Sequence, residues 1–196
     1  MSKAEKTKAF IIEKTAPIFN KKGYAGTSIN DMTDATGLTR GSIYGNFANK
    51  DEVALAAFDY NLQKINTIFK AEIEKKNTAK DKLLVFVHVY INFLSHPFPS
   101  GGCPILNTAT EADDTHPELK KKVLFGILRW KDTIIELIEK GIADKEFAEN
   151  VNPEQIALTI IATIEGGLMI TQTTGKLNYL KLIMKSVEKI INDLVI

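Results

Sequence analysis

The sequence predicts an all-α protein. Apolar residues recur three and four positions apart through most of the chain, which is the spacing of an amphipathic helix, and no segment keeps the two-residue alternation of a half-buried strand. The 196 residues are long enough to bury a sizeable core, and 44% hydrophobic with 25% charged residues is an ordinary globular composition.

A single cysteine excludes an internal disulfide, and the charged N-terminal segment lacks the apolar core of a secretory signal. No apolar run reaches the roughly 20 residues of a membrane-spanning helix. We therefore expect a cytoplasmic protein without a membrane partner.

Charge is distributed unevenly, although the net charge of the chain is only +1. Residues 1–50 hold eight basic residues against four acids, so this segment carries +4 and the remainder carries −3. A basic segment favours a polyanionic partner, whereas a chance excess of lysine on a solvated face would give the same count. Charge alone leaves both interpretations open.

Three helices are expected in the first fifty residues. The first covers residues 3–22, with its apolar positions on one face, and Gly23 is the signal that ends it. Two shorter helices follow, separated by a tight turn at Gly37. Hydroxyl side chains can cap both, because their oxygens accept the free backbone N–H groups of a first turn. The expected caps are Thr27 or Ser28 for the second helix and Thr39 for the third.

Six further helices are expected after residue 48. All but the last begin at a capping side chain or at a proline, which fits the first turn of a helix. The helix over 78–95 is apolar on nearly all sides, so we place it at the centre of a second domain. We expect two domains, one over residues 1–50 and a helical one over residues 51–196. The expected helices cover residues 49–76, 78–95, 104–113, 117–141, 153–174 and 177–193.

Residues 27–50 have the spacing of a helix-turn-helix and the polar groups that DNA contact requires. A recognition helix places hydrogen-bonding side chains on its outer face, near its N-terminus, to reach base edges and phosphates. Arg40 is one of only two arginines, and its planar fork suits guanine or phosphate, although a solubilising charge or a structural salt bridge would also explain it. The positions that fit the DNA-contacting role are Thr39, Arg40, Gly41, Ser42, Tyr44 and Asn46.

The same segment resembles the tetracycline-repressor (TetR) family of bacterial transcription regulators. The resemblance rests on Phe19, Gly23-Tyr24, Thr27-Ser28, Gly37-Leu38, Gly41-Ser42-Ile43-Tyr44, Phe47 and Lys50-Asp51-Glu52. It implies a DNA-binding head, a helical effector-binding body, and a homodimer that leaves its operator when a small molecule binds.

The resemblance also implies roles for single residues. Phosphate contacts are implied for Thr27, Tyr44 and Lys50. Base-facing or groove-lining positions are implied for Thr39, Arg40, Ser42 and Asn46, and Ser28 completes the expected DNA-binding set. Gly45 and Asn46 stand where many members carry larger or basic side chains, so the base preference does not transfer.

The last expected helix carries an apolar stripe that we interpret as a dimer seam. Its members, at spacings of three and four, are Leu177, Leu180, Met184, Val187, Ile191 and Leu194. The alternative is that the core of a single chain uses this stripe, together with the apolar stripe of the preceding helix.

Polar residues that stand singly among apolar ones are the candidate effector-binding positions. His88 and Asn92 lie four apart on an apolar helix, so they need internal partners, water or a ligand. Cys103 precedes an expected helix, where a thiol becomes more acidic; it could sense electrophiles or be a small buried hydrophobe. The full expected set is His88, Asn92, Cys103, Asn107, Glu111, Trp130 and Glu165.

No enzyme signature is present in the sequence. We find no phosphate-binding glycine loop, no zinc-protease motif and no nucleophile elbow, and we expect neither a cofactor nor a metal site. The sequence therefore predicts a repressor whose partners are operator DNA, a small-molecule effector and a second copy of the chain. The alternative is a helical ligand- or partner-binding dimer without specific DNA recognition, which salt-dependent binding to duplex DNA would distinguish.

Overall fold

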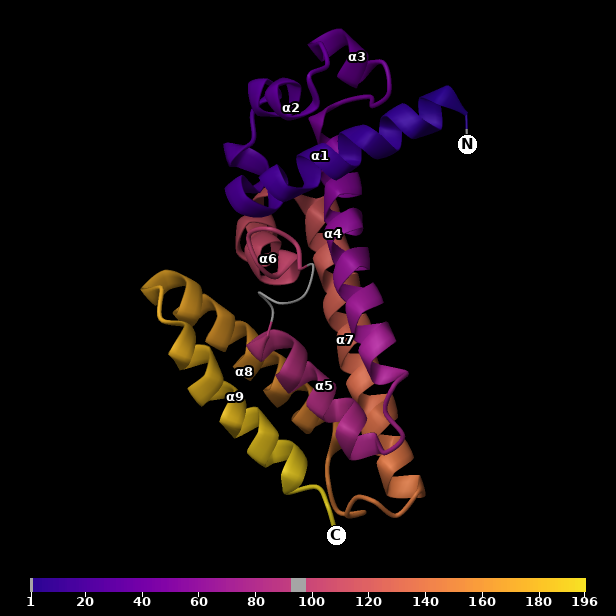
Figure 1. The fold of residues 1–196 in the computed structure, drawn as a ribbon, viewed down its shortest axis with the longest axis vertical. Coiled ribbons are helices and arrows are strands. Elements are labelled where there is room, and N and C mark those ends of the chain that lie inside the picture. Colours follow the sequence, from indigo (N-terminus) through magenta and orange to yellow (C-terminus); the bar gives the residue numbers. More distant parts are fainter. Residues whose placement is uncertain (1, 93–97) are drawn as a thin grey trace. The chain divides into compact units, whose positions relative to one another are not determined.

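The computed structural model describes residues 2–92 and 98–196 and confirms the all-α fold class (Figure 1). Within these ranges the chain forms helices and no strand, and the only strand-like pairing is an isolated bridge between Phe147 and Val195. The helices are α1 (Lys3–Gly26), α2 (Ile29–Thr36), α3 (Arg40–Tyr44), α4 (Lys50–Ile73), α5 (Ala79–Ile91), α6 (Pro104–Thr115), α7 (Pro117–Ala143), α8 (Pro153–Thr174) and α9 (Leu177–Asn192). The expected end of the fifth helix at Ser95 lies outside the described residues.

The contacts of the chain gather in two compact units. The first comprises Met1–Ile65 and Pro99–Gly126, and the second comprises Asn66–Phe98 and Ile127–Ile196. Helices α4 and α7 each contribute residues to both units. The domain boundary near residue 50 stays a prediction.

Side-chain caps begin the helices of the first unit where the sequence predicts them. The Ser28 hydroxyl accepts the Asp31 N–H at 3.1 Å, while the Asp31 carboxylate accepts the Ser28 N–H at 2.8 Å, so the two residues form a capping box for α2. Thr39 accepts the N–H of Ser42 at 3.2 Å and thereby begins α3. Gly37 ends α2 with a φ of 68°, in the left-handed region that glycine enters without steric cost.

A small apolar core holds these first helices together. Because the buried residues come from α1, α2, α3, the turn after α3 and the start of α4, helix α3 is fixed by packing although it has only five residues. The core consists of Ile11, Ala16, Phe19, Met32, Ile43, Phe47, Val53, Ala54 and Ala57.

The core of the second unit combines an aromatic cluster with aliphatic residues. Phe69 stacks on Phe86 with ring centroids 5.0 Å apart, and Tyr90 stacks on Trp130 at 5.8 Å. Such pairs add about 0.5–1.5 kcal/mol each to the free energy of burial. Helix α9 packs against α8 and α5.

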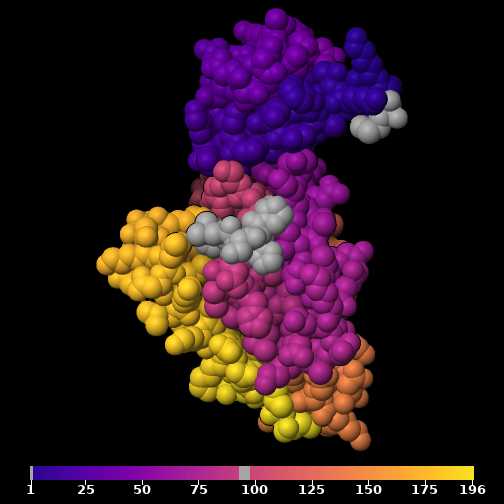
Figure 2. Space-filling model, viewed as in Figure 1, coloured from indigo at the N-terminus to yellow at the C-terminus, as the bar shows by residue number. Residues whose placement is uncertain are grey.

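The stripe that we interpreted as a dimer seam belongs to this core, so that interpretation is wrong. Leu180, Met184, Val187, Ile191 and Leu194 are all buried within the single chain, and of the six only Leu177 is exposed. The alternative that the core of one chain uses the stripe is correct, because α9 turns these residues toward α8 and α5. The opposite side of α9, yellow in Figure 2, lies at the surface.

Helix α8 is long and apolar enough to cross a membrane by length and composition alone. Seven of its residues are buried in the protein, and α9 is its main packing partner. This packing accounts for much of its apolar character, as in the core helices of many soluble proteins.

The loop after α7 binds both the start of α5 and the last residues of the chain. The Glu146 carboxylate accepts the N–H groups of Ala79 and Lys80, each at 3.1 Å. The N–H of Ala148 donates to the carbonyl of Leu194 at 2.9 Å, and that of Ile196 donates to the carbonyl of Glu146 at 3.3 Å. Residues 194–196 are therefore part of the folded unit.

Candidate functional site

The expected recognition helix presents an open, polar outer face. Arg40 is exposed, and its guanidinium lies over the ring of Tyr44, 5.8 Å from the ring centroid. Gly41 is exposed too, and among the described residues a Cβ built on it would meet nothing closer than the Thr39 hydroxyl at 3.9 Å. The absence of a side chain at Gly41 leaves room for a close approach to the helix backbone.

The remaining polar residues of the site lie in α3 or directly after it. The Asn46 side-chain amide donates to the carbonyl of Ser42 at 2.9 Å. Ser42, Tyr44 and Asn46 are half-buried, so each keeps part of its surface accessible to a partner. The structure thus gathers Thr39, Arg40, Gly41, Ser42, Tyr44 and Asn46 on one short segment, and their contacts with DNA stay predictions.

Thr27 and Ser28 are tied into the backbone before α2. The Thr27 hydroxyl is buried and donates to the carbonyl of Gly23 at 2.6 Å. The Ser28 hydroxyl donates to Asp31 at 2.8 Å, in addition to capping α2. A phosphate contact by the Thr27 hydroxyl would require the exchange of its present carbonyl partner, so this role also stays a prediction.

The cations of this unit differ in how they are neutralised. Lys8 pairs with Glu52 and Lys22 with Asp31, each at 2.6 Å, and these lysines hold the pKa of both carboxyl groups below their ordinary values. Arg40 and Lys50 instead lie over tyrosine rings, with the Lys50 ammonium 4.4 Å from the centroid of Tyr24. A ring face orders a cation without cancelling its charge. Arg40 and Lys50 therefore remain available to an anionic partner.

The expected effector-binding residues fall in both units. His88, Asn92, Trp130 and Glu165 belong to the second unit, and Cys103, Asn107 and Glu111 belong to the first. Cys103 is buried at the start of α6. Asn107 and Glu111 hydrogen-bond to α1. The role of the whole set in binding an effector stays a prediction.

His88 and Asn92 are not enclosed by the apolar residues of α5, contrary to our expectation. Both are exposed, and the Asn92 amide donates to the carbonyl of His88 at 3.0 Å. The other sides of α5 are buried, so the helix has one polar edge that needs no internal partner.

Trp130 is the expected ligand residue whose surroundings best suit an organic molecule. Its ring stacks on Phe86 and Tyr90, and its indole N–H is buried with no hydrogen-bond partner among the described residues. A buried donor of this kind favours a ligand that brings an acceptor. Glu165 is half-buried on α8.

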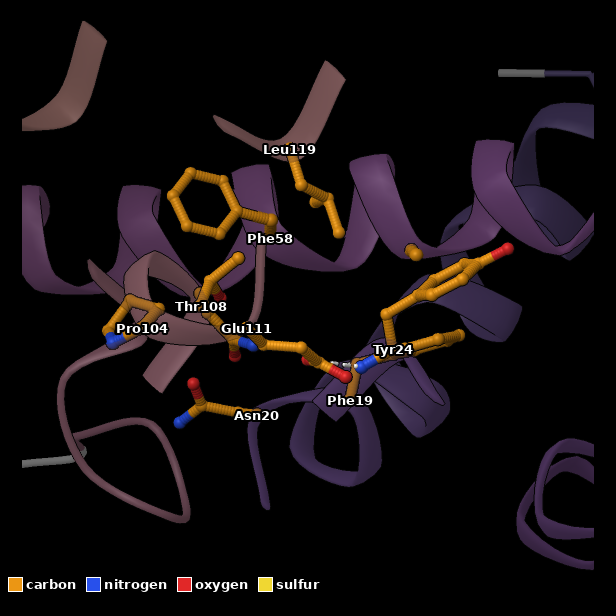
Figure 3. A pocket seen from close by; sticks show the side chains of 10 residues that line it. Phe19, Asn20, Tyr24, Phe58, Pro104, Thr108, Glu111 and Leu119 are labelled. Carbon is orange, nitrogen blue, oxygen red and sulfur yellow. Dashed lines mark hydrogen bonds between the residues drawn. The ribbon is translucent and has the colours of Figure 1, made fainter. Parts of the chain in front are cut away.

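A small hollow lies in the first unit, beside the end of α1 (Figure 3). Its volume of about 20 Å³ is room for about one water molecule, too little for an effector. Of the expected ligand residues, only Glu111 lines it. In the described ranges, no three His, Cys, Asp or Glu side chains gather as metal ligands would.

The sequence reasoning missed a polar cluster between α1, α4 and the start of α7. The Tyr24 hydroxyl donates to the Asp51 carboxylate, and the Tyr24 ring meets the His116 ring edge-on with centroids 4.6 Å apart. This hydrogen bond, with burial, raises the pKa of Tyr24 to about 12. The three residues lie far apart in sequence, so no local pattern could reveal their contact.

Comparison with known proteins matches both parts of the chain. Residues 11–57 match the family described as bacterial regulatory proteins, tetR family, and residues 79–187 match the tetracyclin repressor-like C-terminal domain. A TetR-family transcriptional regulator from Cytophaga hutchinsonii, known from its crystal structure, is 46% identical, with 100% of this chain and 98% of that chain covered and a TM-score of 0.96. The chain belongs to the TetR family.

Further relatives agree with this assignment to the TetR family. A TetR regulator of known structure from Chloroflexus aurantiacus is 37% identical, with 100% of this chain and 98% of that chain covered and a TM-score of 0.94. The transcriptional regulator TtgR of Pseudomonas putida is 42% identical over 169 residues, which are 83% of this chain and 79% of TtgR. The chain is accordingly a helix-turn-helix transcriptional regulator, and a ligand-responsive repressor role is typical of its family.

Proposed function

We propose that this chain is a cytoplasmic, homodimeric repressor that binds an operator through α3 and leaves it when a small molecule binds the second unit. The observation that supports operator binding best is the outer face of α3. There a capped helix presents Arg40, whose charge no carboxylate of the described residues neutralises, beside the uncovered backbone of Gly41. This arrangement fits entry into a major groove.

Binding-site selection from random duplex DNA with the purified protein tests this proposal. We expect enrichment of a two-fold symmetric sequence whose half-sites are about one helical turn apart. Affinity for the selected duplex should fall steeply with salt, because lysine and arginine contacts displace counterions from phosphates. Failure to enrich any sequence, with salt-independent binding, would favour a ligand- or partner-binding dimer instead.

The proposed dimer uses the surface of α8 and α9 that is left uncovered in one chain. Exposed apolar residues on this surface are Leu158, Met169, Ile170, Leu177 and Leu182. They lie on sides of the two helices other than the buried stripes, so a second copy can cover them without disturbing the core. Dimerisation is typical of the family.

The proposed effector is an apolar or amphipathic molecule that contacts Trp130. Support comes from the aromatic rings around Trp130 and from its buried indole N–H. Trp130 is the only tryptophan of the chain, so its fluorescence reports binding directly. Because linkage is reciprocal, a true effector weakens operator affinity by the same factor by which operator DNA weakens effector binding.

A further inference from the structure

Helix α6 is joined to the end of α1 by two hydrogen bonds to one carboxylate. The Glu111 carboxylate accepts the backbone N–H of Tyr24 through Oε2 and that of Ala25 through Oε1, each at 2.7 Å. Figure 3 shows Glu111 beside Tyr24. The two bonds join residues that are 87 and 86 positions apart in sequence. Both partners lie in the first unit, which also contains the recognition helix.

A break in α1 creates the free N–H groups that Glu111 accepts. Gly23 has φ 72° and ψ 179°, a conformation that is essentially restricted to glycine, so residues 24–26 form a new turn with their own unsatisfied donors. A carboxylate is the preferred partner at such a turn, because it also faces the positive end of the peptide dipoles. A Cβ on Gly23 would collide with the Glu111 carboxylate in its present position, so a larger residue at position 23 would displace this carboxylate.

A second set of hydrogen bonds ties the same two helices one turn earlier. The Asn107 amide donates to the carbonyl of Asn20 at 3.0 Å and to that of Gly101 at 2.9 Å. The Asn20 amide donates to the carbonyls of Ser100 and Gly102 at 2.9 and 3.0 Å. Asn20 is 5% exposed, and its bond to the carbonyl of Gly102 is buried. The first turns of α6 are therefore fixed relative to α1, which makes Glu111 a rigid support.

The turn that Glu111 holds leads directly into the DNA-binding segment. Thr27 follows it and returns two hydrogen bonds, from its hydroxyl to Gly23 and from its N–H to Tyr24, before α2 begins. Tyr24 itself lies under the Lys50 ammonium and donates to Asp51, so it also contacts the start of α4. One carboxylate thus supports the turn that precedes the helix-turn-helix and the tyrosine that meets the helix following it.

We infer that Glu111 is a positioning residue for DNA recognition, which holds the α1–α2 junction and Tyr24 in the geometry that operator binding uses. This inference rests on the proposed binding of an operator duplex. Glu111 acts through backbone N–H groups and Tyr24 and does not itself touch DNA.

Because Glu111 is negatively charged, the direction in which operator affinity changes on its removal tests the inference. If Glu111 acted only as a negative charge in the DNA-binding unit, its removal would strengthen DNA binding, because repulsion of phosphates would decrease. If it positions the junction, its removal weakens operator binding although a negative charge is lost. The two roles predict opposite changes.

The test compares Glu111→Gln with Asp114→Asn. Both substitutions remove one negative charge from α6 and keep the side-chain shape, but Asp114 is exposed, and the N–H groups of Tyr24 and Ala25 bond to Glu111 instead. On the duplex selected with the wild-type protein, we expect Glu111→Gln to bind roughly tenfold more weakly, a loss of about 1.4 kcal/mol. Its salt slope should be unchanged because no phosphate contact is lost. Asp114→Asn should bind as tightly as wild type or more tightly. Equal affinities of the two variants overturn the inference.

Hydrogen exchange of the wild-type protein supplies a second measurement that needs no variant. If the Glu111 bonds favour operator binding, operator DNA must favour these bonds, because coupling is reciprocal. We expect the amides of Tyr24 and Ala25 to exchange several-fold more slowly in the operator complex than in the free protein. Unchanged exchange at both amides overturns the inference, even if Glu111→Gln fails to fold. If no duplex is selected at all, the proposed function fails first, so the two failures are distinguishable.

Discussion

At the residue scale, Arg40 and Lys50 are the two cations of residues 27–50, and neither forms an ion pair within the described part of the chain. Each is ordered by a tyrosine ring, Arg40 by Tyr44 within α3 and Lys50 by Tyr24 of α1. Arg40 lies one residue after the Thr39 cap, at the end of the helix that enters a groove. Lys50 begins α4, where the backbone of the duplex is expected. We therefore expect one to read bases and the other to hold phosphate.

Replacement of Arg40 should reduce sequence preference more than general affinity. We expect Arg40→Ala to cost about 1–3 kcal/mol on the preferred operator and to relax the preference at one position of each half-site. Binding to a scrambled duplex should fall less. Titrations of both duplexes by fluorescence anisotropy at several salt concentrations measure the difference.

Replacement of Lys50 is the matched control for this prediction. Lys50→Ala should weaken binding to all duplexes about equally and reduce the salt slope by roughly one per subunit, because one phosphate contact is lost. A parallel loss of affinity for both duplexes in Arg40→Ala would instead make Arg40 a phosphate contact. Base reading would then belong to Thr39, Ser42 and Asn46.

At the scale of single elements, the capping box of α2 should make the stability of the folded protein fall at acidic pH. The hydrogen bonds from Lys22 and Ser28 lower the pKa of Asp31 from its ordinary 3.8 to about 2. A carboxyl group whose pKa is lowered by folding stabilises the protein above its unfolded pKa and loses this contribution as pH falls through the folded pKa.

Comparison of the wild-type protein with Asp31→Asn tests this pH dependence. We expect the variant to unfold at a lower temperature at pH 7 and the difference in Tm to shrink between about pH 4 and pH 2, the range set by the two pKa values. Asp34→Asn, at an exposed position of the same helix, is the control. A difference that persists undiminished at pH 2 would show that the charge of Asp31 is not what stabilises α2.

Two glycines with positive φ, Gly23 at the break in α1 and Gly37 at the end of α2, should differ in their tolerance of substitution. We expect Gly23→Ala to destabilise the protein by about 1–3 kcal/mol from backbone strain, and further because its Cβ displaces Glu111. Gly37 also has a positive φ, but a Cβ there would have no atom of the described residues within 4 Å, so Gly37→Ala should cost only about 1 kcal/mol. Urea unfolding of both variants measures the two losses. The expectation fails if Gly37→Ala is the more destabilised protein.

The sequence predicts the ends of the elements well because their causes are local. Capping side chains and prolines act within one turn, so Ser28, Thr39 and Pro117 mark helix starts without any knowledge of the fold. The partner that covers an apolar stripe, in contrast, cannot be read from the residues near it in sequence. A spacing of three and four shows that Met184 and Val187 are buried, but not whether the same chain or a second one buries them.

In the candidate site too, the sequence predicts the local features but not the contacts between distant residues. The sequence is sufficient to place Arg40 and its neighbours on a capped helix after a glycine turn. It could not show that Glu111 binds the end of α1, because that contact joins residues 87 positions apart and depends on tertiary packing. It also could not show that His88 lies on the exposed edge of an otherwise buried helix.

At the scale of the whole molecule, the exposed residues of α8 and α9 should decide the oligomeric state. Met169 is 53% exposed and Leu182 is 57% exposed, so charges there leave the core of one chain intact. We expect Met169→Glu with Leu182→Glu to sediment as a folded monomer with unchanged helical circular dichroism.

A substitution in the buried stripe is the control for this experiment. Met184 has no exposed surface, so Met184→Lys should lose helical structure, because an unpaired charge in the core is costly. A double variant at Met169 and Leu182 that remains a dimer of unchanged affinity would place the interface elsewhere. Leu124, Phe125 and Leu128 of α7 would then be the next exposed apolar surface to examine.

The hydrogen bonds of residues 194–196 affect how the protein should be labelled or immobilised. Because Leu194 and Ile196 bond to the loop that also bonds to the start of α5, a fluorophore or affinity tag fused directly after Ile196 would adjoin these bonds. Ser2 is engaged as well, since its side chain caps α1. A flexible glycine-serine spacer at either attachment point would leave both sets of bonds intact. Immobilised or labelled protein for operator-binding measurements should therefore carry such a spacer.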